Sequence, residues 1–152
     1  MCRCSRPIAT YLLCFTKFEM SVKVLLLLCV VVVVTYGKLQ TITVKGQLAC
    51  DNKSVQNVNV ELREADTLDP DDSLGSTHSD RKGHFEVSGQ EDEVGSIEPY
   101  LRITHNCDGG TINPKCTIVD DYRIPKEHIN GIYDMGIVSL NIAQEVHKKT
   151  CT

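Results

Sequence analysis

The amino-acid sequence predicts an all-β fold, an antiparallel β-sandwich of about seven to eight strands. Three observations support this prediction. Apolar and polar residues alternate over short stretches, as expected for strands that are buried on one face. Sustained helical periodicity is nearly absent. Clusters of Gly, Pro, Asn and Asp separate the apolar stretches at short intervals, which is typical of turns between strands.

The predicted strands are recognised by apolar residues that share one parity along the chain. In order these residues are Ile42, Val44, Leu48 and Cys50; Val58, Val60 and Leu62; Phe85 and Val87; Leu101, Ile103, His105 and Cys107; and Cys116 and Ile118, in a strand that runs towards Tyr122–Ile124. Gly46 interrupts the first strand, which predicts a bulge or a tight bend at that point.

The last predicted strand spans about residues 136–144 and has a different pattern. Its apolar residues Ile137, Val138, Leu140 and Ile142 occupy both parities. Strands of this kind are usually central in a sheet or covered on both faces, so we expect such a position for this strand.

Polar segments mark the expected turns. These segments are residues 69–72, 80–83, 88–93 and Asn130-Gly131. Gly83 is expected to supply a backbone angle that other residues avoid, closing a turn before Phe85 enters the core. One short helix is expected near residues 125–129, because Pro125 suits the first position of a helix.

The segment 20–37 has the organisation of a secretory signal peptide. It combines a short basic start at Met20–Lys23, an apolar run of eleven residues from Val24 to Val34, and a small residue, Gly37, at the expected cut. A membrane-spanning helix needs about 20 apolar residues, so we favour a cleaved signal over an uncleaved anchor and expect no transmembrane segment.

Cleavage after Gly37 leaves one secreted, extracellular domain, residues 38–152. Residues 1–19 fit no part of a signal and are expected to be an upstream extension that is absent from the native product. Residues 1–37 carry four Lys or Arg and one Glu, so the net charge of −4 becomes −7 without them. That charge argues against nucleic acid as a partner.

Four of the eight cysteines remain after cleavage, and we expect them to form two disulfides. They are Cys50, Cys107, Cys116 and Cys151. Three pairings are open. We favour Cys107–Cys116, because the residues between them are rich in turn formers, which leaves Cys50–Cys151 as the second bridge. A zinc site is disfavoured by the lack of a closely spaced Cys-x-x-Cys pair.

Asn52-Lys53-Ser54 is an N-glycosylation sequon in a polar stretch between two apolar ones. We therefore predict a surface loop with Asn52 as the glycosylation site. Because many sequons stay empty and Cys50 lies two residues away, the sequence leaves the occupancy of Asn52 open.

Six short motifs follow one another along the chain between Val44 and Leu140. They are VKGQLAC at Val44–Cys50, VNVEL at Val58–Leu62, DRKGHF at Asp80–Phe85, PYLRITHNC at Pro99–Cys107, RIP at Arg123–Pro125 and MGIVSL at Met135–Leu140. With the cysteines and the signal peptide, they resemble the transthyretin-like family, secreted proteins that are especially numerous in nematodes. This resemblance implies a transthyretin-like, prealbumin-type β-sandwich.

The same fold hosts an enzyme, 5-hydroxyisourate hydrolase, so the catalytic residues of that family must be compared. The hydrolases carry a catalytic His in the first strand and end in a Tyr-Arg-Gly-Ser signature. Here the first strand, Leu39–Cys50, contains no His, and the C-terminus reads Glu145–Thr152 without that signature. We therefore expect no hydrolase activity and no catalytic residues.

The remaining polar candidates have structural interpretations that we prefer. His105 shares the parity of Leu101 and is interpreted as a hydrogen-bonded, partly buried histidine near a disulfide. His78 and His84 flank a turn and point only weakly to a metal. The acidic residues between Asp66 and Asp72 offer calcium ligands but match no calcium-binding loop. No cofactor or metal site is predicted.

The leading functional hypothesis is a non-enzymatic extracellular binding, signalling or bridging protein. Its partner would be an extracellular or cell-surface protein, a lipid or a small molecule, contacted through the loops at 66–79 and 89–98. The alternative is a small-molecule carrier of hormone or lipid that resembles transthyretin and assembles around a channel. The hydrolase, already disfavoured by the sequence, is the third hypothesis, and a structural role in a cuticle or secreted matrix is a further alternative. The sequence does not identify the ligand or the oligomeric state.

Overall fold

The computed structural model describes residues 22–28, 37–65, 70–93, 95–144 and 146–152. The chain divides into two compact units, residues 1–37 and Lys38–Thr152. In the first unit residues 22–28 are helical and exposed, while the expected upstream extension and much of the expected signal peptide lie outside the described residues. Within the described ranges, no helix is both long enough and apolar enough to cross a membrane.

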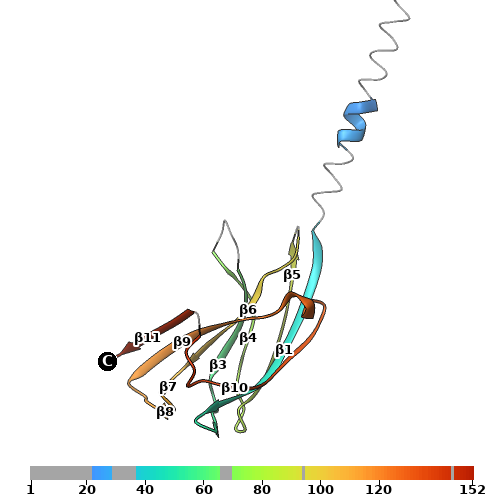
Figure 1. Cartoon of the computed structure of the whole chain (residues 1–152). Helices are drawn as coiled ribbons and strands as arrows, with labels where there is room; N and C mark the ends of the chain where they lie inside the picture. The colour runs from blue at the N-terminus through green and yellow to red at the C-terminus, as the bar shows by residue number, and fades with distance from the viewer. Residues whose placement is uncertain (1–21, 29–36, 66–69, 94, 145) are drawn as a thin grey trace, which may run out of the picture. The chain divides into compact units, whose positions relative to one another are not determined.

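The second unit is built from strands, as the alternation predicts (Figure 1). In chain order the elements are β1 (Lys38–Cys50), β2 (Lys53–Ser54), β3 (Asn59–Glu64), β4 (Asp72–His78), β5 (His84–Glu93), β6 (Pro99–His105), β7 (Cys107–Asp108), β8 (Thr111–Ile112), β9 (Cys116–Arg123), η1 (Lys126–His128), β10 (Gly131–Ser139) and β11 (Val146–Cys151). The short 3-10 helix η1 lies where one helix is expected.

Two sheets and a small hairpin organise these strands. The four-stranded sheet has the order β10-β1-β2, with β5 also paired to β1, and the five-stranded sheet has the order β11-β9-β6-β3-β4. Strands β7 and β8 form the hairpin. The two larger sheets pack through one apolar core, so the predicted sandwich is confirmed.

One strand pair departs from the antiparallel prediction: β10 runs parallel to β1. The connection from β9 through η1 crosses from the five-stranded to the four-stranded sheet. At its end, Asn130 N–H donates to Thr41 O at 2.6 Å, and Asn130 Oδ1 accepts from Thr41 N–H at 3.1 Å. These bonds place the start of β10 beside the first half of β1, a crossover that alternation alone does not reveal.

The core is formed by the inward residues of both sheets. From β1, β5 and β10 they include Ile42, Val44, Leu48, Phe85, Val87 and Val138; from β3, β6 and β9 they include Val60, Leu62, Leu101, Ile103 and Tyr122. These positions match the predicted strand parities. Two sheets that each present one apolar face must bury those faces against each other, which holds the sandwich together.

The prediction for the last strand is wrong, because β10 ends at Ser139 and is an edge strand with Ile137 73% exposed. Lys45 pairs with Asp134 and Gln47 pairs with Ile137. Two residues of β10 therefore lie opposite the single residue Gly46 of β1. This bulge, with Gly136 at φ 63°, reverses the parity of the residues that follow. Ile137, Val138, Leu140 and Ile142 all follow this bulge, so their two parities reflect the exposed side chain of Ile137 and not cover on both faces.

Two segments that read as polar loops or turns are strands. Residues 88–93 belong to β5, which pairs with β1 from Lys38 onwards. Strand β4 occupies half of the expected loop 66–79, of which 66–69 lie outside the described residues. Strand β11 was not expected from the pattern, since all six of its residues are exposed. Edge strands need no alternating apolar face, so alternation does not detect them.

The favoured disulfide pairing, Cys107–Cys116 with Cys50–Cys151, is wrong. The structure pairs Cys50 with Cys107 and Cys116 with Cys151. The residues between Cys107 and Cys116 do turn, but they fold into the β7–β8 hairpin, and Cys107 reaches the end of β1 in the opposite sheet. Cys116 and Cys151 lie directly opposite each other on β9 and β11.

The turn at Gly83 is confirmed, and its geometry gives a test. Gly83 has φ +80°, and an added Cβ would lie 2.5 Å from the carbonyl oxygen of Leu48. We expect Gly83→Ala to lower the free energy of unfolding by about 3 kcal/mol, through left-handed backbone strain and this clash. Denaturant unfolding measures the loss.

Gly109→Ala is the matched control for this substitution. Gly109 also has a positive φ, +56°, but an added Cβ meets nothing within 4 Å. Its loss should be limited to the backbone strain, about 1 kcal/mol. Equal losses for the two variants would show that the close approach to Leu48 is not significant.

Candidate functional site

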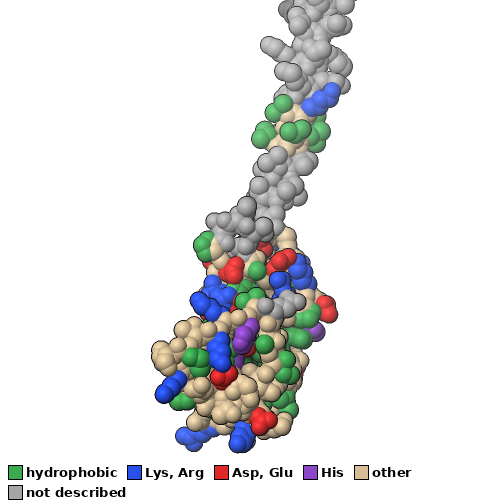
Figure 2. All heavy atoms as spheres, turned by 60° about the vertical axis from the view of Figure 1, so that its left-hand side comes forward, with side chains coloured by type: hydrophobic (Ala, Val, Ile, Leu, Met, Phe, Trp, Pro, Cys, Tyr) green, Lys and Arg blue, Asp and Glu red, His purple; other side chains and the backbone are tan. Residues whose placement is uncertain are grey.

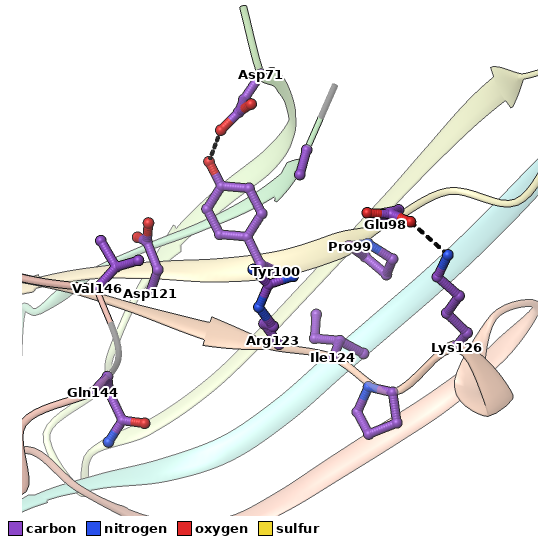
Figure 3. Close-up of a pocket in the computed structure, with 12 residues that line it drawn as sticks. Asp71, Glu98, Pro99, Tyr100, Asp121, Arg123, Ile124, Lys126, Gln144 and Val146 are labelled. Carbon is purple, nitrogen blue, oxygen red and sulfur yellow. Dashed lines mark hydrogen bonds and ion pairs between the residues drawn. The ribbon is translucent and has the colours of Figure 1, made fainter. Parts of the chain in front are cut away.

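A hollow of about 730 Å³ opens on the five-stranded sheet, where β6 begins and β9 ends (Figure 3). Its lining residues come from the residue after β3, the segment before β4, the start of β6, the stretch from the end of β9 into η1, and the start of β11. They are Ala65, Asp71, Glu98, Pro99, Tyr100, Asp121, Arg123, Ile124, Pro125, Lys126, Gln144 and Val146. Five separate segments therefore meet at one place.

Tyr100 stands in the hollow from β6. Alternation along this strand turns Leu101 into the core and Tyr100 to the opposite face. The Tyr100 hydroxyl donates to Asp71 Oδ2 at 2.6 Å and accepts from Arg63 Nε at 3.0 Å. Burial raises the pKa of Tyr100, and the bond to Asp71 raises it further. The phenol is therefore neutral and held in one orientation.

Paired charges surround this tyrosine. Lys126 Nζ donates to Glu98 Oε1 at 2.7 Å, which lowers the pKa of Glu98 (Figure 3). Arg102 donates from two nitrogens to the two oxygens of Asp121, at 2.8 Å each, and lies 5.5 Å from the centre of the Tyr100 ring. The bond to Asp121 raises the pKa of Arg102. The charges of Glu98, Lys126 and Asp121 at the hollow are thus balanced by neighbours.

Apolar side chains form the rest of the wall. Ala65, Pro99, Ile124, Pro125 and Val146 all line the hollow. No Ser, Thr, Cys or His occurs among the described lining residues, so they hold no nucleophile–base pair of the Ser–His or Cys–His kind. An apolar wall with a few fixed polar groups is the usual composition of a small-molecule binding site.

A second polar cluster lies inside the sandwich and contains His105. This histidine is 5% exposed, and its Nδ1 accepts from the N–H of Cys107 at 3.1 Å. Its Nε2 therefore carries the proton and donates to Asp120 Oδ2 at 3.0 Å. The interpretation of His105 as a hydrogen-bonded histidine beside a disulfide is confirmed, although it is buried more fully than expected.

Two members of this cluster were not found from the sequence. Asp120 on β9 is fully buried, and its Oδ1 lies 2.6 Å from Nδ1 of His147 on β11. Asp120 shares the parity of Ile118 and Tyr122, which was the available signal that it faces inward. His147 carried no such signal, because its strand has no buried residue. His105 and Asp120 lie in the interior of the fold and His147 lies at its surface, and these three residues do not line the hollow beside Tyr100.

The other histidines do not assemble a metal site. His78 and His84 line a second open hollow of about 550 Å³, and His84 Nδ1 lies 3.7 Å from Asp80 Oδ2. No cluster of His, Cys, Asp or Glu that could hold a metal occurs in the part of the chain that the structure describes. Of the acidic segment suggested for calcium, Asp71 and Asp72 are described and residues 66–69 lie outside the described residues.

Asn52 lies at the tip of the tight turn between β1 and β2. Asp51 and Asn52 have φ of 47° and 62°, and both side chains are exposed. Cys50 pairs with Lys53 across the turn. The sequon is therefore accessible at the surface, and its glycosylation stays a prediction.

Sequence matches to known proteins all point to one family. The model of the transthyretin-like family matches residues 45–125. Transthyretin-like protein 16 of Caenorhabditis elegans is 43% identical over 131 residues, which cover 86% of this chain and 98% of that protein. Transthyretin-like protein 5 of the same animal is 38% identical over 127 residues, covering 78% and 90%. Transthyretin-like protein 2 is 36% identical over 116 residues, covering 68% and 77%.

Among solved structures, a 9R-lipoxygenase from Cyanothece aligns with 65% of this chain and 16% of its own at a TM-score of 0.40 and 22% identity, too low to support an inference. The family model, in contrast, spans more than half of the chain, and its range holds most of the motifs from the first strand to the Arg-Ile-Pro segment. The chain belongs to the transthyretin-like family.

Proposed function

We propose that this chain is a secreted, non-enzymatic extracellular binding protein. Its binding site is the hollow beside Tyr100, and its ligand is a small molecule with an apolar body and a polar group. The observation that carries the proposal is the combination of an apolar wall with oriented polar groups in a hollow of about 730 Å³. Such a hollow is large enough for an ordinary small ligand.

Secretion is supported by three features. The segment 20–37 reads as a signal peptide, and the boundary between the two compact units falls between Gly37 and Lys38, at the expected cut. All four cysteines beyond the cut are paired in disulfides, which is usual for a small domain in an oxidising compartment.

A binding role is supported over catalysis by the arrangement of the polar side chains. β1 contains no histidine where the related hydrolases carry their catalytic one. His105 and Asp120 are occupied with each other and with neighbouring groups inside the sandwich. The relatives are named transthyretin-like proteins.

Processing gives the first test of this proposal. Expressed in full in secreting animal cells, the chain should appear in the medium with Lys38 as its first residue. Peptide-N-glycosidase treatment should reduce its mass, and Asn52→Gln should remove that reduction, since Asn52 is exposed at a turn. Edman sequencing and intact-mass measurement report both results. Medium protein that begins at Met1 or Cys4 would contradict the assignment of residues 1–37.

Ligand binding gives the second test. The probe is 8-anilinonaphthalene-1-sulfonate, which has an apolar ring system and one anionic group. The secreted chain should bind it saturably, and Arg123→Glu should weaken binding about fivefold, because the substitution reverses a charge that lines the hollow. Fluorescence titration measures the dissociation constants.

Arg81→Glu is the matched control, an identical charge reversal at an exposed turn residue that does not line the hollow. It should leave the affinity unchanged. Equal affinities for the wild type and both variants, each with unchanged thermal unfolding, would place the probe elsewhere and refute the assignment of the hollow.

A further inference from the structure

The two disulfides of this domain differ in their exposure. Cys50 and Cys107 are 3% and 1% exposed, so that bridge is sealed inside the sandwich. In the other bridge Cys116 is 4% exposed, but Cys151 is an exposed residue near the chain end. The second bridge is therefore less deeply buried than the first, on the side of Cys151.

The strand that carries Cys151 is attached through its backbone pairing with β9 and through polar side chains. β11 pairs with β9 from Val146 to Cys151, and none of its six side chains is buried. His147 bonds to Asp120 at 2.6 Å and Lys149 Nζ to Asp108 at 2.7 Å. Figure 2 brings this side of the domain forward and shows Lys and His side chains at its surface. Because none of its side chains is packed in the core, β11 depends on the disulfide to stay attached to β9.

The buried sulfur has a hydrogen-bond donor. Asn113 Nδ2 lies 3.2 Å from Cys116 Sγ, and Asn113 Oδ1 accepts from the N–H of Lys115, which keeps the amide oriented. In thiol–disulfide exchange the sulfur that is not attacked leaves as a thiolate, and stabilising that thiolate accelerates the reaction. The surroundings thus favour attack on Cys151 with Cys116 as the leaving group.

We propose that Cys116–Cys151 is a thiol-exchange site at which a low-molecular-weight thiol, RSH, forms a mixed disulfide with Cys151. The RS⁻ thiolate attacks Cys151 Sγ, the Cys116–Cys151 bond breaks, and Cys116 Sγ takes the electron pair and then a proton. A second RSH displaces Cys151 as a thiol and yields RSSR. Exchange detaches β11 and frees the edge of β9.

Glutathione tests the site directly. The protein secreted from the complete chain is incubated with reduced glutathione, quenched with acid and alkylated. Each cysteine is then followed by peptide mass spectrometry. We expect Cys116–Cys151 to open at least about tenfold faster than Cys50–Cys107, with glutathione found on Cys151. Equal rates for the two bridges, or glutathione mainly on Cys116, would overturn the proposal.

Substitutions at Asn113 test the leaving-group argument. Asn113→Ala removes the donor and should slow opening about threefold, while Asn113→Asp also adds a negative charge beside the thiolate and should slow it more. If the disulfide opened at the wild-type rate in both variants, Asn113 would not stabilise the Cys116 thiolate as it leaves.

Hydrogen exchange tests the structural consequence. In the Cys116→Ser/Cys151→Ser variant the amides of β11 should lose protection while those of β1, β3 and β6 keep it. Should this variant lose protection everywhere, the same measurement on the glutathione-treated wild type decides the outcome. Retained protection of β11 after its disulfide opens would show that the strand does not detach.

Discussion

Replacing Cys50 and Cys107 together by alanine is expected to lower the free energy of unfolding by about 4 kcal/mol. The bridge joins residues 57 positions apart, so it removes much conformational freedom from the unfolded chain. It also ties the end of β1 in one sheet to the start of β7, two residues past the end of β6 in the other sheet. Both side chains are buried, so their loss reduces core packing as well.

Denaturant unfolding of the secreted chain, followed by circular dichroism, measures this loss. The matched control is the double alanine substitution at Cys116 and Cys151. In that variant β11 should unfold at a lower denaturant concentration than the remaining strands. Loss of Cys50–Cys107 should instead destabilise all strands in one transition. A change below about 1 kcal/mol in the first variant would mean that the bridge does not hold the two sheets together.

Asp120→Ala is expected to lower the free energy of unfolding by about 3 kcal/mol. The carboxylate is fully buried and bonded to two imidazoles, at 3.0 Å to His105 and 2.6 Å to His147. Its removal leaves the buried N–H of His105 without an acceptor in a place that water does not reach easily. The loss should therefore exceed that of an ordinary surface ion pair.

The neighbouring Asp121→Ala is the control, since the same change removes a carboxylate from the opposite face of β9. Its partner Arg102 has a side chain that is 33% exposed and can be solvated by water. We expect a loss of about 1 kcal/mol for this variant. Thermal and denaturant unfolding report both values. Equal losses for the two variants would show that burial of the Asp120 cluster adds no stability.

The alternation of apolar and polar residues was sufficient to predict the sandwich, because the core positions follow this pattern closely. Leu101 and Ile103 on β6, and Val60 and Leu62 on β3, are all fully buried at the predicted parity. The turn at Gly83 was predictable for the same local reason, since a positive φ restricts the residue type. Local sequence patterns were thus enough to predict the fold class.

Features that depend on distant parts of the chain were not predictable. The parallel β1–β10 pair follows from a crossover between sheets, and the bulge at Gly136 reverses parity within one strand. The disulfide pairing depends on which strand ends meet in space, which residue spacing does not determine. Each of these errors comes from a three-dimensional contact that has no local signature.

The candidate site was predictable only in part for the same reason. Of the two regions expected to contact a partner, residues 66–79 and 89–98, Asp71 and Glu98 line the hollow. The tyrosine at its centre, however, belongs to a strand that was assigned to the core. Tyr100 has the parity opposite to Leu101, yet it is 5% exposed because charged neighbours and the Asp71 carboxylate cover it.

Native mass spectrometry of the chain purified from the medium of secreting cells tests the central claim most directly. We expect a protein that begins at Lys38 and carries a small molecule, which is released on denaturation. Arg123→Glu should lose most of this molecule, and Arg81→Glu should retain it. Purified protein that carries no molecule, or an equal amount bound to both variants, would contradict the proposal that this domain is a secreted binding protein acting through the hollow beside Tyr100.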